Sequence, residues 1–407
     1  MLSNQGTVSE EYIQLCFMVD ALVKEAKGKD FVVIDSYFGP PDFKHKDKTP
    51  NPDELLKSLH TFRARIRKEI HEEPHRTFLT KQLDAIVLLV RYALDDNVTF
   101  EERVRTGLDV EVVTVSSERI EELAEQANRA LRKKVLKGDL TSMAARWRKQ
   151  AMTTGSEIIP IAQEIAMDAR RSTQRVLFEL PETESVEFRA VPDAPWSAYN
   201  YYQGDFKAVI EINTQLPRSK YGIWKWVTHE AYPGHQTQLV QRELGYQQDT
   251  QNLEATIALI NTPDCTIVEG LAETGPNILS SDRPPTEAET ITSYITQLRR
   301  AVGVNALVML QQQQKNESEV LGYIKELGAY EEAYAKAQLP FMIDPIWGPY
   351  GFTYFVGAWL VKGFFKAAQE ANLLDEFINA LYYELHTPST LKTRIKDLDL
   401  KLPNQLI

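Results

Sequence analysis

The chain has 407 residues, of which 43% are hydrophobic and 25% are charged, a composition that excludes collagen-like, low-complexity and wholly disordered proteins. Its net charge of −11 argues against nucleic acid or an anionic membrane surface as the main partner. Its two cysteines, Cys16 and Cys265, are too few for a disulfide framework.

Residues 1–14 lack the basic and then apolar pattern of a secretory signal peptide. The longest apolar run, residues 350–365, is shorter than the ~20 residues that a membrane-spanning helix needs, and it contains Lys362. The sequence therefore predicts a soluble, cytoplasmic protein without a membrane partner, and it leaves the oligomeric state open.

Apolar residues recur at helical spacing in most of the chain, which predicts a mainly α fold. Asn51 is placed to cap a helix that has Pro52 at its first position. A capping box at Thr286 and Glu289 opens a further long helix. Other helical stripes are Tyr12–Val23, Leu79–Val90 and Ile120–Leu131.

Strand signals are few and lie in the middle of the chain. Lys207–Asn213 (KAVIEIN) is the clearest, Phe188–Val191 is weaker, and a Tyr-rich loop precedes the first of these. We expect only a very small β element beside the helix that follows. A division near residue 180 separates a helical region, residues 1–180, from residues 181–407, which carry the chemistry, within one continuous structural unit.

The sequence HEAYPGHQ contains His229, then Glu230, and then His235 six residues after the first histidine. Zinc helices of the His-Glu-x-x-His type place their histidines four apart, on one face. Six residues leave the two histidines about 240° apart on an ideal helix, so a straight helix would not bind one ion. Because Pro233 and Gly234 can redirect a helix, we expect a break there that brings both imidazoles together.

Glu269 and Glu273 lie four residues apart in TIVEGLAETG, so they share one helix face. Such pairs are usually a solvated face, but apolar residues flank this one. A catalytic zinc site with two histidines takes a carboxylate from a second helix and an acceptor that orients a ligand histidine. We expect these roles for Glu269 and Glu273, respectively. The alternative is that His229 and His235 are ordinary buried or surface polar groups.

HEAYPGHQ closely resembles the HExxPGHH signature of the bacterial proteins grouped as "domain of unknown function 885", although Gln236 replaces the final histidine. EGLAETG and the later YFVG resemble two further segments of that family. The resemblance covers about residues 195–360. It implies kinship with helical zinc peptidases such as carboxypeptidase Taq and angiotensin-converting enzyme, and therefore a large helical fold with a central groove.

Zinc bound by His229, His235 and Glu269 would make hydroxide available at neutral pH, with Glu230 as the general base. We expect Tyr354, the tyrosine of YFVG, to donate a hydrogen bond to the oxyanion of the intermediate, with Tyr350 as the reserve candidate. The residues predicted to contact substrate are Tyr201, Tyr202, Ile210 and Tyr350. Ile210 lies in the strand that could pair with an extended peptide.

The sequence thus predicts a zinc-dependent hydrolase that cleaves short peptides. A metal hydrolase of a non-peptide amide and a non-catalytic binding protein that retains the fold remain alternatives. Two histidines and a carboxylate can also bind iron or manganese. Arg170, Arg171 and Arg175 could bind a substrate carboxylate, but helix-surface charge is the default reading.

Overall fold

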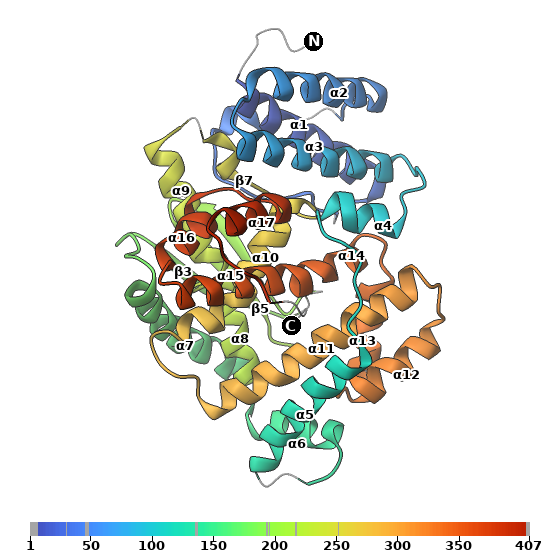
Figure 1. The fold of residues 1–407 in the computed structure, drawn as a ribbon, viewed down its shortest axis with the longest axis vertical. Coiled ribbons are helices and arrows are strands. Elements are labelled where there is room, and N and C mark those ends of the chain that lie inside the picture. The colour runs from blue at the N-terminus through green and yellow to red at the C-terminus, as the bar shows by residue number, and fades with distance from the viewer. Residues whose placement is uncertain are drawn as a thin grey trace.

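The computed structural model describes residues 7–29, 31–44, 49–134, 137–192, 194, 196–215, 218–250 and 252–403. The predicted mainly α fold is confirmed (Figure 1). The α-helices are α1 (Val8–Lys27), α2 (Pro52–Glu69), α3 (Glu73–Ala93), α4 (Phe100–Glu102), α5 (Ser117–Lys133), α6 (Leu140–Gln150), α7 (Gly155–Val176), α8 (Lys220–Glu230), α9 (His235–Gln248), α10 (Pro263–Leu279), α11 (Glu287–Gln311), α12 (Glu317–Leu327), α13 (Glu332–Ile343), α14 (Trp347–Phe352), α15 (Ala358–Glu370), α16 (Leu374–Ile378) and α17 (Pro388–Asp397). Short 3₁₀ and π turns are η1 (Pro41–Phe43), η2 (Arg103–Gly107), η3 (Leu253–Thr256), η4 (Thr353–Gly357) and η5 (Asn379–Tyr383).

Among the described residues, no helix combines the length and the apolar character needed to cross a membrane.

Helices α1, α2 and α3 pack against one another at one end of the molecule (Figure 1). As predicted, Asn51 caps α2: its side chain accepts hydrogen bonds from the backbone amides of Asp53 and Glu54, and Pro52 occupies the first turn. The cap satisfies amides that have no partner within the helix.

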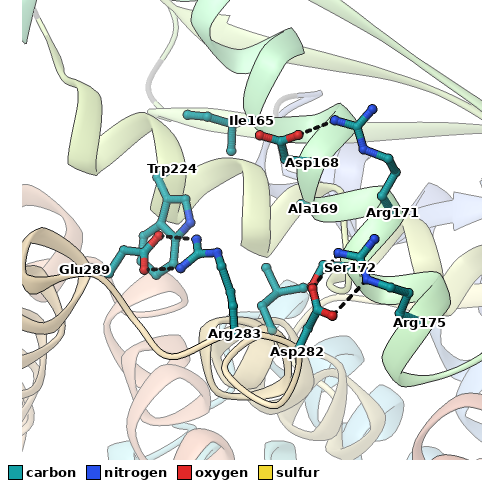
Figure 2. Close-up of a pocket in the computed structure, with 11 residues that line it drawn as sticks. Ile165, Asp168, Ala169, Arg171, Ser172, Arg175, Trp224, Asp282, Arg283 and Glu289 are labelled. Carbon is teal, nitrogen blue, oxygen red and sulfur yellow. Dashed lines mark hydrogen bonds and ion pairs between the residues drawn. The ribbon is translucent and has the colours of Figure 1, made fainter.

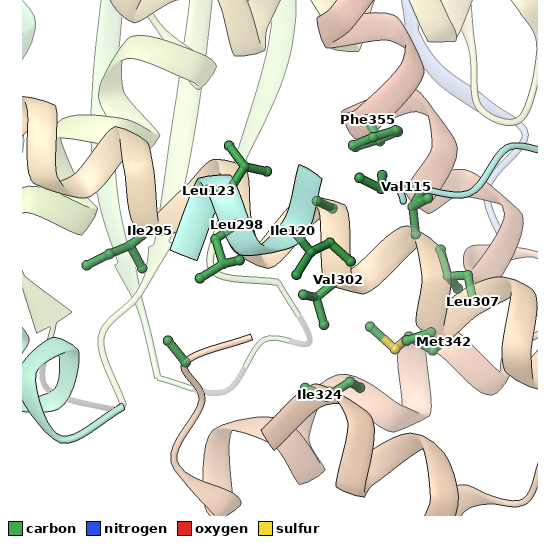
Figure 3. Packing of buried hydrophobic residues seen from close by; sticks show 14 of the residues in the cluster. Val115, Ile120, Leu123, Ile295, Leu298, Val302, Leu307, Ile324, Met342 and Phe355 are labelled. Carbon is green, nitrogen blue, oxygen red and sulfur yellow. The ribbon is translucent and has the colours of Figure 1, made fainter. Parts of the chain in front are cut away.

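The opposite end is built from α5 and α6 with α11, α12 and α13 (Figure 1). The predicted capping box of Thr286 and Glu289 starts α11, the longest helix of the described residues. Ile120 and Leu123 of α5 and Leu298 and Val302 of α11 belong to one buried cluster, shown in Figure 3. Their burial stabilises each side chain by about 1.5–3 kcal/mol relative to exposure.

The central sheet has three strands in the order β3 (Ser185–Val191), β5 (Lys207–Asn213), β4 (Ala198–Gly204). Strand β5 has the predicted bounds, runs parallel to β3 and antiparallel to β4. The expected Tyr-rich loop is instead the strand β4, because its alternating residues fit a pleated surface with one buried face. Since β5 is hydrogen-bonded on both edges, it has no free edge for an extended peptide, and that expectation is corrected.

Two small antiparallel pairs join distant parts of the chain. Strand β1 (Ile34–Tyr37) pairs with β7 (Ile257–Leu259), and β2 (Met152–Thr153) pairs with β6 (Arg218–Ser219). The first pair joins the segment that follows α1 to the segment just before α10 by backbone hydrogen bonds. The predicted boundary near residue 180 falls between α7 and β3, and the division into two regions stays a prediction.

Candidate metal centre

The helix that carries His229 stops at Glu230, and a new helix starts at His235. The break is therefore where Pro233 and Gly234 predicted it. A Cβ atom at Gly234 would lie 1.8 Å from the carbonyl oxygen of His229, so only glycine lets the chain fold back over the end of α8. This return brings the two histidines together.

His229, His235 and Glu269 form a compact cluster contributed by α8, α9 and α10. Each offers one ligand atom, and these three atoms all lie within 4.8 Å of one another. Nε2 of His229 is 3.2 Å from Oε2 of Glu269, and Nε2 of His235 is 3.8 Å from Oε1 of Glu269. The two imidazole rings have centroids 4.7 Å apart and are almost perpendicular. The side chains are 12%, 14% and 8% exposed, respectively.

The cluster fits a tetrahedral zinc ion. Bonds of about 2.0–2.2 Å in that geometry place ligand atoms roughly 3.3–3.5 Å apart. The two histidines approach the carboxylate of Glu269 at 3.2 Å and 3.8 Å, and the three candidate ligand atoms lie within 4.8 Å of one another. Oε2 of Glu269 is buried and forms no hydrogen bond of good geometry with the described residues, and Nε2 of His229 lies 3.2 Å from it. A cation bound between this oxygen and the imidazole would satisfy both groups. Two imidazoles and one carboxylate are also the ligand set of catalytic zinc sites.

Glu273 lies on the far side of the His229 ring, as the sequence predicts for an orienting residue. Its Oε1 is 3.1 Å from Nδ1 of His229, 2.5 Å from a guanidinium nitrogen of Arg300 and 3.7 Å from Nζ of Lys225. A proton on Nδ1 donated to this carboxylate leaves Nε2 free for a metal. Burial lowers the pKa of His229, but the contacts with Glu269 and Glu273 outweigh it and raise that pKa to about 10.

Helix α10 packs very close to the backbone of the neighbouring segments. A Cβ atom at Gly270 would lie 2.4 Å from the carbonyl oxygen of Gly357, and one at Gly357 would lie 2.2 Å from that of Thr266. A Cβ atom at Gly275 would lie 2.6 Å from the carbonyl oxygen of Thr228. These glycines let α10 lie against η4 and α8, which places the two glutamates of α10 beside His229.

The carboxyl group of Glu230 lies near the cluster and has no partner among the described residues. Its side chain forms no hydrogen bond or ion pair with the part of the chain that the structure describes. Removal from water raises the pKa of Glu230 to about 8; the proximity of His229 opposes the rise, and the charges of Glu269 and Asp35 add to it. Burial also lowers the pKa of His235 to about 4, so that imidazole is neutral and able to bind a metal at neutral pH.

Tyr350 and Tyr354 are both near the cluster but differ in their hydroxyl contacts. Tyr350 is buried and donates a 2.6 Å hydrogen bond to Oε1 of Glu269, while the thiol of Cys265 donates to Tyr350 at 3.3 Å. The ring of Tyr354 lies 6.2 Å from the ring of His229, and its hydroxyl has no hydrogen bond to the described residues. The hydroxyl of Tyr350 is therefore engaged by Glu269, whereas that of Tyr354 has no such contact.

Of the four residues predicted to contact substrate, Tyr350 is buried and bonded to Glu269, and the other three divide into two buried residues and one exposed residue. Tyr202 is buried and its hydroxyl donates to Glu243, and Ile210 is 1% exposed in the hydrophobic core, so neither is placed to touch a substrate. Tyr201 is exposed on β4. Tyr199, which β4 presents two residues earlier, donates to Asp35 of β1. Sequence spacing gave no sign of Asp35, because β1 reaches the site only through tertiary pairing.

A cavity of about 390 Å³ lies away from this cluster, among α7, α8, α10 and α11 (Figure 2). Each arginine that lines it is paired with an acid: Arg171 with Asp168, Arg175 with Asp282, and Arg283 with Glu289. Arg170 likewise pairs with the buried Glu184. Paired charges of this kind match the default reading of these arginines as structural.

The fold is shared with solved structures, whereas no family model and no curated protein matches the chain. A crystal structure of a "putative lipoprotein" from Colwellia psychrerythraea has a TM-score of 0.59 at 14% identity, covering 86% of this chain and 70% of that one. A "putative lipoprotein of unknown function" from Shewanella oneidensis has a TM-score of 0.56 at 9% identity, covering 85% and 72%. At these identities the likeness shows the fold alone.

Two predictions are corrected by these comparisons. The assignment to "domain of unknown function 885", and with it the kinship to carboxypeptidase Taq and angiotensin-converting enzyme, is wrong, because no family model matches and the structural neighbours are described only as lipoproteins. An eight-residue motif specifies a helix break and the two histidines on either side of it, which is too little to define a family. The predicted cytoplasmic location is contradicted as well, because both of these structural neighbours are described as putative lipoproteins.

Proposed function

We propose that the chain is a zinc-dependent hydrolase that cleaves the amide bonds of short peptides. The observation that carries the proposal is the cluster of His229, His235 and Glu269, with ligand atoms within 4.8 Å of one another and an unpartnered acid, Glu230, beside it. A zinc ion in such a site supplies a water of lowered pKa and polarises a carbonyl.

The protein's own residues supply the proton transfers. Glu230 takes a proton from the attacking water and delivers it to the leaving nitrogen, a task that suits a carboxyl with a pKa near neutrality. Tyr354 donates its free hydroxyl to the oxygen on which negative charge develops. Tyr350 and Glu273 hold Glu269 and His229 in position through the hydrogen bonds described above.

Glu230 also favours catalysis over metal binding alone. The carboxyl of Glu230 is half-buried near other acidic groups, and it forms no hydrogen bond or ion pair with the described residues that would favour its charged form. A protein that only bound a metal would have no use for this residue, whereas perturbed acids in this setting are typical of active sites.

The test is a cleavage screen with a mixture of short peptides, read by mass spectrometry, on zinc-loaded wild-type protein. Glu230→Gln should retain zinc but lose about 10²–10⁴-fold in turnover. Glu326→Gln, an exposed change on α12, is the matched control and should leave turnover unchanged. Absence of cleavage by the wild type, or full turnover by Glu230→Gln, would refute the proposal.

A further inference from the structure

Asp35 lies at an irregularity of the strand pair β1–β7. Ile34 is opposite Leu259, and Ser36 is opposite Ala258. One residue of β1, Asp35, is therefore left without a partner on β7. Such a β-bulge bends its strand and redirects a side chain, and bulges are over-represented next to active sites. Asp35 is exposed, whereas the residue that follows it is buried, so the bulge presents a carboxylate to solvent.

Contacts on both sides of β1 place Asp35 beside the candidate catalytic residues. The hydroxyl of Tyr199, on β4, donates a hydrogen bond to Oδ1 of Asp35. The next residue of β4, Asn200, donates from its side-chain amide to the backbone carbonyl of Glu230 at 2.8 Å. Three residues before Asp35, Val32 packs against the small apolar cluster that contains both tyrosines of the site. The segment that carries Asp35 therefore meets the site at two points.

The carboxylate of Asp35 has no positively charged neighbour of its own. Glu269 and Glu273 each lie within ion-pair distance of His229, whereas Asp35 forms no ion pair with the residues that the structure describes. Its hydrogen-bond donor is the neutral phenol of Tyr199. Partial removal from water raises the pKa of Asp35 to about 6; the hydrogen bond from Tyr199 opposes the rise, and the charge of Glu269 adds to it. The carboxyl is therefore mostly ionised at neutral pH, and its charge is open to a ligand.

The phenol that contacts Asp35 belongs to a group of three aromatic rings. The ring centroid of Tyr199 is 4.6 Å from that of Tyr201 and 5.5 Å from that of Trp196. Tyr201 is 38% exposed, so solvent reaches this surface. The face of an aromatic ring attracts a cation, and a carboxylate beside it adds a charge-assisted hydrogen bond. The combination suits an ammonium group and disfavours an anion.

We infer that Asp35 binds the terminal ammonium of a peptide substrate. Tyr199 positions its carboxylate, and the rings of Tyr201 and Trp196 extend the surface on which the first residue of the peptide lies. The inference rests on the proposed function and deepens it, because it makes the enzyme one that cleaves near a free amino terminus. A chain terminus suits the subsite better than a lysine side chain, because an ammonium fixed to the backbone loses less rotamer freedom on binding.

The test compares the binding of two ligands that differ in one group. Alanyl-alaninamide carries a terminal ammonium, and lactyl-alaninamide has a hydroxyl in its place. Calorimetry on zinc-loaded Glu230→Gln protein measures both without cleavage, and the ammonium ligand should bind at least about 10-fold more tightly. Asp35→Asn keeps the shape of the side chain but removes its charge, so it should abolish this preference. Asp205→Asn, an exposed change in the turn after β4 at a positive φ that asparagine adopts readily, should preserve it.

Tyr199→Phe tests the positioning role separately. It removes the hydroxyl that contacts Asp35, so it should reduce the preference for the ammonium ligand. The affinity for lactyl-alaninamide should stay unchanged, which a general loss of structure would not allow.

Thermal unfolding verifies that each variant is folded, and Asp35→Ser replaces Asp35→Asn if the asparagine variant does not fold. Equal affinity for the two ligands, no binding of the ammonium ligand, or a preference that persists without the Asp35 carboxylate would overturn the subsite. Binding of N-acetyl-lysinamide as tight as that of alanyl-alaninamide would also overturn it, because the subsite would then accept a lysine side chain.

Failure of the proposed function looks different. A protein that prefers the ammonium ligand through Asp35 but cleaves no peptide in the screen keeps the subsite and loses the hydrolase. A protein that cleaves peptides with free and acetylated amino termini equally keeps the hydrolase and loses the subsite.

Discussion

The hydroxyl of Tyr350 donates a 2.6 Å hydrogen bond to Oε1 of Glu269, whereas that of Tyr354, four residues later, bonds to none of the described residues. The two tyrosines lie across the junction of α14 and the π turn η4, which redirects the second ring toward His229. One tyrosine thus holds a ligand, and the other is left with a donor for a substrate.

The two tyrosines should therefore give opposite results when only the hydroxyl is removed. Tyr354→Phe should lower turnover about 10²–10³-fold and leave zinc affinity unchanged, since it removes an oxyanion donor. Tyr350→Phe should weaken zinc binding about 10–100-fold, as expected for the loss of a residue that orients a ligand. Turnover and zinc titration on the same preparations check both. Unchanged turnover in Tyr354→Phe would assign that ring to packing.

Glu273 should act on the metal through His229. Glu273→Gln keeps the size of the side chain but removes the charge that holds the imidazole proton on Nδ1, so zinc affinity should fall about 10–100-fold. Glu326→Gln again serves as the exposed control. Competition with a zinc chelator measures the affinity, and an unaltered value for Glu273→Gln would mean that it has no role in orienting His229.

Features that depend on neighbouring residues could be predicted from the sequence, whereas features formed by segments far apart in the chain could not. Asn51, Thr286 and the Pro233–Gly234 break act on their own backbone, so each was predictable and is present. The expectation that Lys207–Asn213 has a free edge was wrong, because β3 and β4 are hydrogen-bonded to this strand on either side.

The surroundings of the candidate site illustrate the same limit. Glu269 and Glu273 were found by their helical spacing, which is a local signal. Arg300 was not, because it comes from α11 and meets Glu273 only when the helices pack. Ile210 was misjudged for a related reason, since burial on both faces of a short strand is decided by what packs on the sheet.

Gly234 should tolerate no side chain. Gly234→Ala would place Cβ 1.8 Å from the carbonyl oxygen of His229, so the turn must open, and we expect a loss of at least about 3 kcal/mol in stability together with loss of zinc. Gly245→Ala, in the helix α9 with nothing within 4 Å of its Cβ, should instead be neutral or stabilise by about 0.5–1 kcal/mol. Denaturant unfolding distinguishes the two. Equal stability of the variants would contradict the described turn.

The ionisation of Glu230 should make the metal-free protein less stable as the pH rises. Its pKa of about 8 in the folded chain exceeds the ~4.3 of an unfolded glutamate, so the folded state binds this proton more tightly. The resulting stability is fully present below pH ~4.3, is lost progressively up to pH ~8, and is constant above. In chelator-treated samples, the melting temperature of wild type relative to Glu230→Gln should fall by roughly a few degrees between pH ~5 and ~8. Parallel curves would place the pKa of Glu230 in its ordinary range.

The central claim is that His229, His235 and Glu269 together bind one catalytic zinc ion, and elemental analysis of the purified protein tests it most directly. The wild type should contain about one zinc per chain, and His235→Ala should contain almost none, because a catalytic site with two remaining protein ligands binds zinc poorly. His60→Ala, an exposed histidine on α2, should retain the wild-type content. A wild type that takes up no metal, or a His235→Ala protein with full zinc occupancy, would contradict the account.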